Sequence, residues 1–285
     1  MSIIVEKQQC PNCNGPIGSA GGSYRTCPYC ASEFYLPPKK GYRIPADRPY
    51  PQPPTIGTWR VGDQRYLIHG RLGRGQHSDV YLAHSARALT QLVVLKIERV
   101  GGRVAVENEW SALRQIRARS EFLRHMTASP VGLAETDGKL TAVYRWRPGF
   151  SFTLVDAKRE YPQGVDPRAA VWMWNRILDQ LSCLEEIDWS HGALTPEHLL
   201  LHPRDHGVAF CGWSRAARVD GQDLRRSGAA IATLLGRNAP KPLIELAYHA
   251  DCFEHAASLQ QELRRIAESA FGPPRFHKFT LTGGQ

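Results

Sequence analysis

The stretch LGRGQHSDVYLA at residues 72–83, followed by VVLKI at residues 93–97, decides the fold of this 285-residue chain. Gly73 and Gly75 lie between segments rich in β-branched and aromatic residues, which is the pattern of two strands joined by a turn. VVLKI is a third such segment, and a single cation, Lys96, lies among its apolar residues. A lone Gly-x-Gly is a weak signal, because any turn between strands can use it. The stretch therefore predicts consecutive strands but does not by itself give the glycines a role.

The pattern continues outward from this stretch as a strand-rich half followed by a helix-rich half. We expect strands at residues 66–72, 80–84, 92–98 and 140–146, and one helix at 106–124. Beyond Gly149 the apolar residues recur at spacings of three and four, which predicts helices at 167–187, 222–235 and 255–269. This order of elements indicates an α+β fold.

Four of the seven cysteines form two tight pairs near the N-terminus, in Cys10-Pro-Asn-Cys13 and Cys27-Pro-Tyr-Cys30. This spacing places two pairs of thiolates opposite each other, as a tetrahedral zinc site requires, and four thiolates leave no position open for water. The surrounding segment has too few apolar residues for a core of its own, so metal binding would contribute directly to its folding. We predict one structural zinc ion in a small four-cysteine zinc ribbon at residues 1–36.

Seven prolines lie between residues 37 and 54. Such a density excludes a helix or a central strand and predicts an extended, semi-stiff spacer. We therefore place a Pro-rich linker at residues 37–57, between the ribbon and the larger domain.

The remaining features of composition bear on location and partners. No run of eighteen apolar residues exists and the first ten residues are too polar for a signal peptide, so we expect a cytoplasmic protein without membrane contact. The odd cysteine total argues against a disulfide framework, and Cys183, Cys211 and Cys252 are expected to be small buried hydrophobes. The net charge of +9 is compatible with nucleic acid as a partner, but the arginines are spread along the chain and support this only weakly.

The first stretch resembles the glycine-rich loop and the third strand of a protein kinase. The resemblance implies that Gly73 and Gly75 let backbone N–H groups approach the phosphates of a nucleotide, with Ser78 in place of the usual third glycine. It also implies that Lys96 pairs with the α- and β-phosphates and with a helix glutamate, a position that Glu109 fits, with Glu107 as the alternative. These residues would belong to a kinase-like N-lobe at residues 58–149.

A second stretch, HGALTPEHLLL at residues 191–201, resembles the kinase catalytic loop. Aligned on this loop, the catalytic aspartate is replaced by Ala193, the phosphate-contacting lysine by Thr195 and the metal-binding asparagine by His198. Alanine has no group that accepts a proton, and an imidazole nitrogen is a poor substitute for the oxygen ligands of Mg²⁺. The resemblance therefore keeps the frame of the loop and loses its working residues.

The segment VAFCGWSRA at residues 208–216 resembles the strand that leads into the metal-binding triplet of a kinase. Gly212 would replace the aspartate of that triplet, and an alignment shifted by one residue puts Cys211 there instead. His191, Trp213 and Leu113 match packing positions of the kinase interior. The Mg²⁺ carboxylate is missing in either alignment.

DLRRSG at residues 223–228 resembles the start of the large buried helix of a kinase C-lobe, whose aspartate holds the backbone of the catalytic loop. Only ten residues separate Asp223 from Gly212. The activation segment and the peptide-docking elements of the family do not fit in that gap. The resemblance thus implies a reduced C-lobe at residues 150–285.

Taken together, the chain is similar to a bacterial-type serine/threonine pseudokinase with an N-terminal zinc ribbon, in a bilobal kinase-like fold. The resemblance implies a catalytically inactive scaffold or regulator in signalling, with a kinase, a phosphatase or another signalling protein as partner. Three alternatives stay open: ATP binding without Mg²⁺ and without turnover, an unorthodox ATP-dependent kinase or transferase, and a zinc-ribbon adaptor for nucleic acid.

Overall fold

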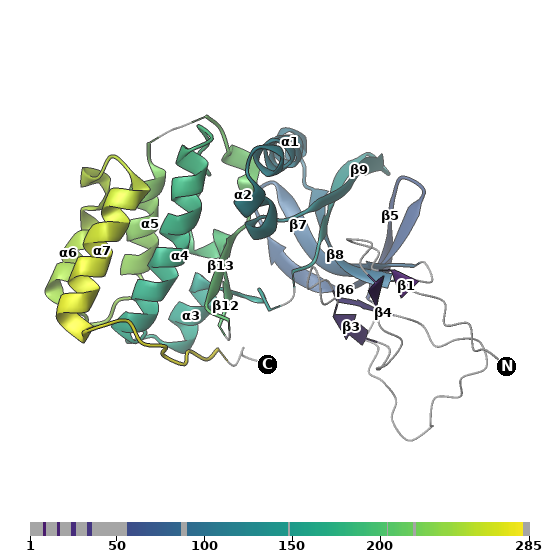
Figure 1. Cartoon of the computed structure of the whole chain (residues 1–285). Coiled ribbons are helices and arrows are strands. Elements are labelled where there is room, and N and C mark those ends of the chain that lie inside the picture. Colours follow the sequence, from purple (N-terminus) through teal and green to yellow (C-terminus); the bar gives the residue numbers. More distant parts are fainter. Residues whose placement is uncertain are drawn as a thin grey trace, which may run out of the picture. The chain divides into compact units, whose positions relative to one another are not determined.

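The computed structural model describes residues 56–86, 90–147, 149–203, 205–218 and 221–281, together with four short strands nearer the N-terminus. These strands are β1 (Gln8–Gln9), β2 (Pro16–Ile17), β3 (Tyr24–Thr26) and β4 (Glu33–Tyr35). The chain divides into unit 1, Met1–Val106 with Ser129–Pro148, and unit 2, Glu107–Ala128 with Gly149–Gln285 (Figure 1). The four cysteines predicted to bind zinc and nearly all of the predicted linker lie outside the described residues.

Unit 1 is built on a curled antiparallel sheet in the order β5-β6-β7-β8-β10-β9 (Figure 1). The strands are β5 (Gly57–Val61), β6 (Gln64–Arg74), β7 (Ser78–Ser85), β8 (Thr90–Glu98), β9 (Pro130–Thr136) and β10 (Lys139–Arg145). The two edge strands, β5 and β9, contact each other, and the Trp59 indole on β5 donates a hydrogen bond to Thr141 Oγ1 on β10 at 3.0 Å. The sheet thus curls around one apolar core, formed by Val61, Tyr66, Ile68, Ala83, Val93, Leu95, Ile97 and Val143.

The predicted strands of this half are all present, because alternating apolar residues face the core. On β8, for example, Val93, Leu95 and Ile97 are buried, whereas the intervening residues face the other way. Sequence reasoning did not predict β5 or β9. β9 carries the two helix-compatible residues Leu133 and Ala134 beside Pro130 and Gly132, so its pattern shows little alternation.

The N-terminal strands reach the sheet of unit 1 by backbone pairing. β3 pairs with β4, and β4 pairs with the start of β8 at Phe34↔Gln91 and Tyr35↔Thr90, antiparallel in both cases. Strand pairing uses backbone N–H and C=O groups, which is why no side-chain pattern in the sequence indicated it. β3 and β4 therefore share a sheet with β8, the strand that carries Lys96, whereas β1 and β2, among the described strands, pair only with each other.

Two helices occupy the region where one helix was predicted at 106–124. They are α1 (Arg103–Arg119) and α2 (Glu121–Met126). Ser120 breaks the run: its backbone is extended (φ −131°, ψ 122°), and its hydroxyl accepts a hydrogen bond from the Leu123 N–H at 3.2 Å. A serine in this geometry is a favoured N-cap, so the residue ends one helix and starts the next.

Unit 2 is organised around the long helix α4 (Pro167–Glu185), which begins where sequence reasoning placed it. Asp166 caps the helix by accepting a hydrogen bond from the Arg168 N–H at 2.9 Å, and Pro167 fits the first turn, where no N–H is needed. Trp174 on α4 donates to Ser227 Oγ on α5 at 3.0 Å, and Gln180 donates to the Val208 carbonyl on β13 at 2.9 Å. These two buried bonds fix α4 between its neighbours.

The other helices and strands of unit 2 cover α4. Helices α5 (Asp223–Ala232) and α7 (Ala256–Phe271) were predicted, and both pack against α4 (Figure 1). Helix α6 (Lys241–Tyr248) was not predicted, because its eight residues are too few for a clear period. The remaining elements are α3 (Leu154–Glu160), a three-stranded sheet of β11 (Phe152–Thr153), β12 (Leu199–His202) and β13 (Gly207–Phe210), and three short 3₁₀ helices, η1 (Pro196–His198), η2 (Trp213–Arg215) and η3 (Ala250–Cys252).

The three lone cysteines are less buried than expected. Cys183 and Cys211 are half-buried and Cys252 is exposed, so the expectation of a buried residue is wrong for Cys252. That residue ends η3 at the surface rather than facing the core. Within the part of the chain that the structure describes, no helix is long and apolar enough to cross a membrane.

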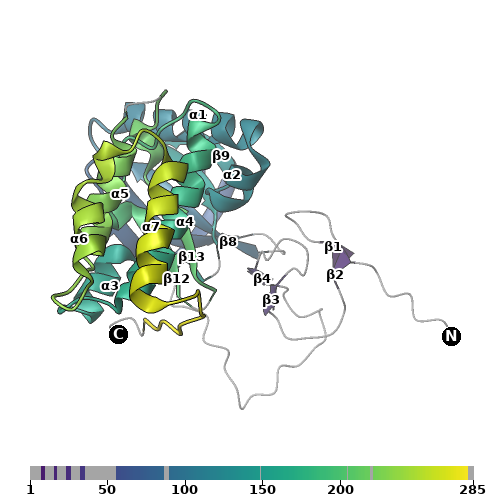
Figure 2. The ribbon, with the colours of Figure 1, turned by 60° about the vertical axis from the view of Figure 1, so that its left-hand side comes forward.

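Beyond α7 the chain continues as an extended segment, residues 273–281, past the end of α3 (Figure 2). This C-terminal strap is held by a ladder of rings: His206 is stacked between Trp172 and Phe276, with ring centroids 4.4 and 4.5 Å away. Phe279 is buried and lies against Trp172 and Tyr161, and the Tyr161 hydroxyl donates to the Thr280 carbonyl at 2.8 Å.

The stacked imidazole makes the strap sensitive to pH. Burial lowers the pKa of His206 below its ordinary value, the nearby charge of Arg176 lowers it further, and a backbone hydrogen bond with His277 opposes them. The unfolded chain therefore takes up a proton at a higher pH than the folded chain does. The stabilisation is complete above the ordinary histidine pKa and is lost as the pH falls through it.

We expect the free energy of unfolding of the wild-type protein to decrease when the pH is lowered from about 7.5 to about 5.5. The variant His206→Phe keeps a ring in the stack but cannot titrate, so its free energy of unfolding should decrease less over the same range. Urea denaturation at the two pH values measures the difference. His84→Phe serves as a comparison, because burial also lowers the pKa of His84. An equal pH dependence in wild type and His206→Phe would contradict the prediction.

Candidate functional site

The loop that resembles a catalytic loop is held in place by one carboxylate. Asp223, in the first turn of α5, accepts hydrogen bonds from the backbone N–H groups of His191 (2.5 Å) and Gly192 (3.1 Å). The guanidinium of Arg226, one turn later, lies 3.2 Å from Oδ1, the oxygen that also accepts from Gly192. Because Asp223 is almost fully buried, these charge-assisted bonds are strong. The contact that the resemblance implied for Asp223 is present.

The next residue of the loop shows why glycine is needed there. Gly192 has a φ of +71°, and a Cβ at this position would lie 2.3 Å from the Arg215 carbonyl oxygen. A side chain fits neither the backbone conformation nor the space. The loop and the segment after Trp213 are thus packed backbone to backbone, and the bridge between Ser190 and Ala217 continues this packing.

The ring of His191 forms the centre of the site. It is fully buried, its Nδ1 accepts from the Ala193 N–H at 3.3 Å, and its Nε2 lies 3.0 Å from the Cys211 carbonyl oxygen. A carbonyl only accepts, so the proton is on Nε2 and the ring is neutral. The Trp213 ring, also fully buried, lies edge-on to it with centroids 4.5 Å apart. These contacts make His191 and Trp213 part of the packed interior of unit 2.

The positions implied for catalysis hold no carboxylate. Ala193 offers the site only its backbone, and Thr195 is exposed, at the start of η1. His198 ends η1, and its Nδ1 lies 2.6 Å from the Ala193 carbonyl oxygen. That nitrogen therefore donates to the carbonyl.

His198 fills the space next to Gly212. The hairpin register pairs Leu199 with Phe210, and the Cys211 N–H donates to the His198 carbonyl at 2.9 Å, so His198 lies opposite the residues that follow β13. Gly212 has a φ of +77°, and a Cβ added to it would lie 2.5 Å from both Nε2 and Cδ2 of the imidazole. No side chain, and hence no metal-binding carboxylate, can start from position 212 while His198 keeps this position.

These residues do not fit a Mg²⁺ ion bound as in a kinase. Mg²⁺ needs oxygen ligands in near-octahedral geometry, whereas the two implied ligand positions hold an imidazole and a glycine that contact each other. Among the described residues, no three His, Cys, Asp or Glu side chains are placed to hold a metal ion. The zinc prediction rests on Cys10, Cys13, Cys27 and Cys30, which lie outside those residues.

The glycine-rich loop of unit 1 is a closed turn. The ladder between β6 and β7 runs to Gly73↔Val80 and Arg74↔Asp79, and the Gly75 N–H donates to the Ser78 carbonyl at 2.9 Å. The Gly75 carbonyl in turn accepts from the Arg99 guanidinium at 2.7 Å. Both polar backbone groups of Gly75 are used within unit 1, so a phosphate would reach its N–H only after the turn opened.

The charged pair that the resemblance implied is divided between the units. Lys96 lies on β8 in unit 1 and is half-buried, and Glu109 lies on α1 in the part that belongs to unit 2 and is buried. Each makes polar interactions. Their pairing, like the nucleotide role of the loop, stays a prediction.

Sequence reasoning treated His198 only as a lost metal ligand and missed its steric role. The signal was available in the hairpin: an imidazole, His198, stands just before β12, and a residue without a side chain, Gly212, stands just after β13. The carbonyl of Cys211 accepts the hydrogen bond of His191 Nε2. This contact could not be identified from the sequence, because the residue type does not determine a backbone contact.

Comparisons with known proteins bear on the fold. No family model matches the sequence, and no curated protein matches it. Among solved structures, the chain is similar to one described as "Crystal structure of BubR1 kinase domain", with a TM-score of 0.61 and 11% identity, over 76% of this chain and 84% of that chain. A likeness at this identity shows the fold alone. The chain therefore has a protein kinase-like fold, as predicted, while its type as a pseudokinase and its zinc ribbon stay predictions.

Removing the anchor of the loop should be costly. We expect Asp223→Ala to lower the free energy of unfolding by about 3 kcal/mol, because two buried N–H groups lose a charged acceptor. Glu268→Ala, on the exposed side of α7, is the matched control and should change it by less than about 0.5 kcal/mol. Chemical denaturation monitored by tryptophan fluorescence measures both, and similar values for the two variants would argue against the anchoring role.

The contact between His198 and Gly212 predicts a coupling between two substitutions. Gly212→Asp alone should destabilise the protein by about 2–4 kcal/mol, through the clash with the imidazole and the positive φ. In the double variant with His198→Asn the smaller side chain makes room, so the double variant should be at least about 1 kcal/mol more stable than the sum of the single effects predicts. A double-mutant cycle of unfolding free energies tests this. Additive effects would show that the two side chains do not compete for space.

Proposed function

We propose that this chain is a catalytically inactive pseudokinase that acts as a scaffold or regulator for a protein partner in signalling. The observation that carries the proposal is the packing of the His198 ring against Gly212, at the two positions where the resemblance implies metal ligands. The space that a metal and its carboxylate would need is filled by protein.

Phosphoryl transfer depends on positioning and on neutralisation of charge, and both need groups that are missing here. Ala193 cannot accept the proton of a hydroxyl substrate. The ten residues between Gly212 and Asp223 are occupied in part by η2 and by the bridge of Ala217 to Ser190, which supports the absence of a platform for a peptide substrate.

The retained contacts support a binding role. Asp223, His191 and Trp213 form a buried and well-bonded centre that no longer serves the chemistry the resemblance implies. On this proposal a partner such as a kinase, a phosphatase or another signalling protein recognises the folded domain. A structural zinc ion held by Cys10, Cys13, Cys27 and Cys30 would support the N-terminal segment as a further docking element.

The proposal also concerns ATP. Lys96, Glu109 and the loop of Gly73, Gly75 and Ser78 are what remains of a nucleotide site by resemblance. ATP bound there would bind without Mg²⁺, because neither implied metal position offers an oxygen ligand.

The test uses the full chain with labelled ATP and measures transfer of the γ-phosphate to the chain itself and to a generic protein substrate. We expect transfer no higher than in Lys96→Ala, and we expect any shift of the melting temperature by ATP to be the same with and without Mg²⁺. Transfer above the Lys96→Ala level would overturn the proposal in favour of an unorthodox kinase or transferase. Stabilisation that requires Mg²⁺ would count against it as well.

The alternative of a nucleic-acid adaptor is separated by a binding assay. Under the scaffold proposal, duplex DNA and structured RNA bind weakly and equally to wild type and to Cys10→Ser. Tight, salt-sensitive binding that Cys10→Ser abolishes would favour the adaptor instead.

A further inference from the structure

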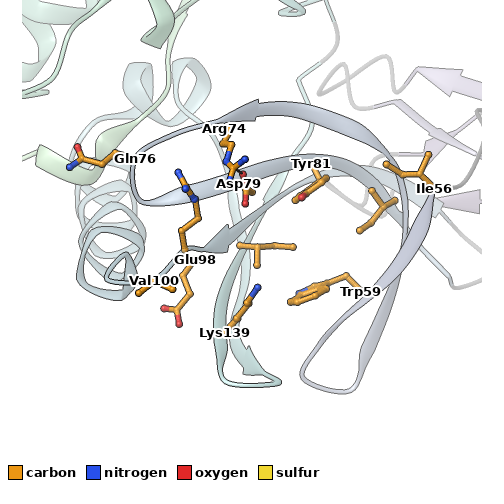
Figure 3. Close-up of a pocket in the computed structure, with 12 residues that line it drawn as sticks. Ile56, Trp59, Arg74, Gln76, Asp79, Tyr81, Glu98, Val100 and Lys139 are labelled. Atoms are coloured by element: carbon orange, nitrogen blue, oxygen red, sulfur yellow. Dashed lines mark ion pairs between the residues drawn. The ribbon is translucent and has the colours of Figure 1, made fainter.

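A cavity of about 520 Å³ opens in unit 1 beside the sheet (Figure 3). The strand register shows the two faces: Asp79 pairs with Ile97, and Val80 pairs with Lys96. Side chains alternate along a strand, so Asp79 and Ile97 share one face and Val80 and Lys96 share the other. Asp79 and Ile97 line the cavity. This part of the wall is thus on the face opposite Lys96, while Glu98, at the end of β8, and Gln76, in the glycine-rich stretch, line the rim.

The wall of the cavity is apolar and aromatic. Ile68 and Ile97 are buried members of the core, and Trp59 and Tyr81 pack against that core. Trp59 is fixed in orientation by its hydrogen bond to Thr141. Wide, rigid aromatic walls favour a flat apolar body, and the volume is within the range of small-molecule sites.

The charges around the cavity are unevenly paired. The Asp79 carboxylate lies 3.5 Å from the Arg74 guanidinium, and the Glu98 carboxylate lies 3.6 Å from that of Arg103. Both acids are therefore compensated by arginines. Arg103 also pairs with Glu135 at 2.7 Å. The oxygens Asp79 Oδ1 and Glu98 Oε2 are buried and accept no hydrogen bond from the described residues.

Two cations at the cavity lack an acidic partner. Lys139, at the start of β10, is exposed, and its side-chain amine makes no hydrogen bond or ion pair with the residues that the structure describes. Figure 3 shows its amine turned toward the middle of the ring of lining side chains. Arg99 donates one N–H to the Gly75 carbonyl and has no carboxylate partner in the same part of the chain. An anionic group placed between them would gain charge-assisted hydrogen bonds.

We propose that this cavity binds a small aromatic compound that carries one negative charge, such as a carboxylate, sulfonate or phosphate. The ring lies against Trp59, Tyr81 and Ile97, and the anion is held by Lys139 and Arg99. The site is independent of the proposed pseudokinase function, because it uses none of the residues on which that function rests.

The test uses the full chain and the aromatic sulfonate 1-anilinonaphthalene-8-sulfonate, whose fluorescence rises in an apolar site. We expect saturable binding of one molecule per chain, and a dissociation constant about tenfold higher in Lys139→Glu, where a favourable charge becomes a repulsive one. Lys241→Glu, an exposed lysine of α6 in unit 2, is the matched control and should bind like wild type. N-phenyl-1-naphthylamine, which has the rings without the charge, should bind wild type and Lys139→Glu equally.

A second readout places the probe in the cavity. In the ¹⁵N–¹H spectrum, the indole resonance of Trp59, assigned from Trp59→Phe, should shift during the titration, and ATP in excess should not displace the probe. Unchanged affinity in a folded Lys139→Glu protein overturns the proposal. So does displacement of the probe by ATP, and so does a titration in which the Trp59 resonance does not move. None of these three outcomes changes the result of the phosphate-transfer assay, so the ligand site and the pseudokinase function are tested separately.

Discussion

The carboxylate of Asp223 holds two consecutive backbone N–H groups, those of His191 and Gly192, and much of unit 2 depends on this contact. It fixes the start of the loop, so the His191 ring points at the Cys211 carbonyl and packs on Trp213. It also brings the loop so close to Arg215 that only glycine fits at position 192. A buried carboxylate is costly without partners, and here Oδ2 accepts from His191 while Oδ1 accepts from Gly192 and Arg226.

The same anchoring holds the loop without help from the positions implied for catalysis. The groups that hold it are the Asp223 carboxylate, backbone N–H and C=O groups, the imidazole of His191 and the indole of Trp213. Residues of the loop that make none of these hydrogen bonds, such as Thr195, can be replaced without breaking the network. Structural and chemical requirements are thus carried by different residues of one short segment.

Much of the fold follows from periodicity in the sequence. The strands β6, β7, β8 and β10 and the helices α4, α5 and α7 have clear apolar periods and good caps, so they were predicted with small errors at their ends. Besides β5 and β9, three features escaped for physical reasons. α6 is too short to show a period, Ser120 divides a continuous helical pattern by a local cap, and β4 joins β8 through backbone bonds alone.

The candidate site divides in the same way. The identity of the replaced residues, Ala193, Thr195, His198 and Gly212, could be taken from the sequence, because it depends only on position in a motif. The packing of His198 on Gly212 depends on hairpin register, and the cavity depends on curvature that brings β5 close to β9. Curvature and register arise from the whole sheet, so no local pattern contains them.

The contact between His198 and Gly212 also limits which single substitutions the chain tolerates. An acidic side chain at position 212 alone would meet the imidazole, and an amide at position 198 alone would leave unfilled volume beside a glycine. Each single change is uphill, although the two changes together relieve the conflict. Positions 198 and 212 therefore act as one unit, which the chain can vary as a pair but not one residue at a time.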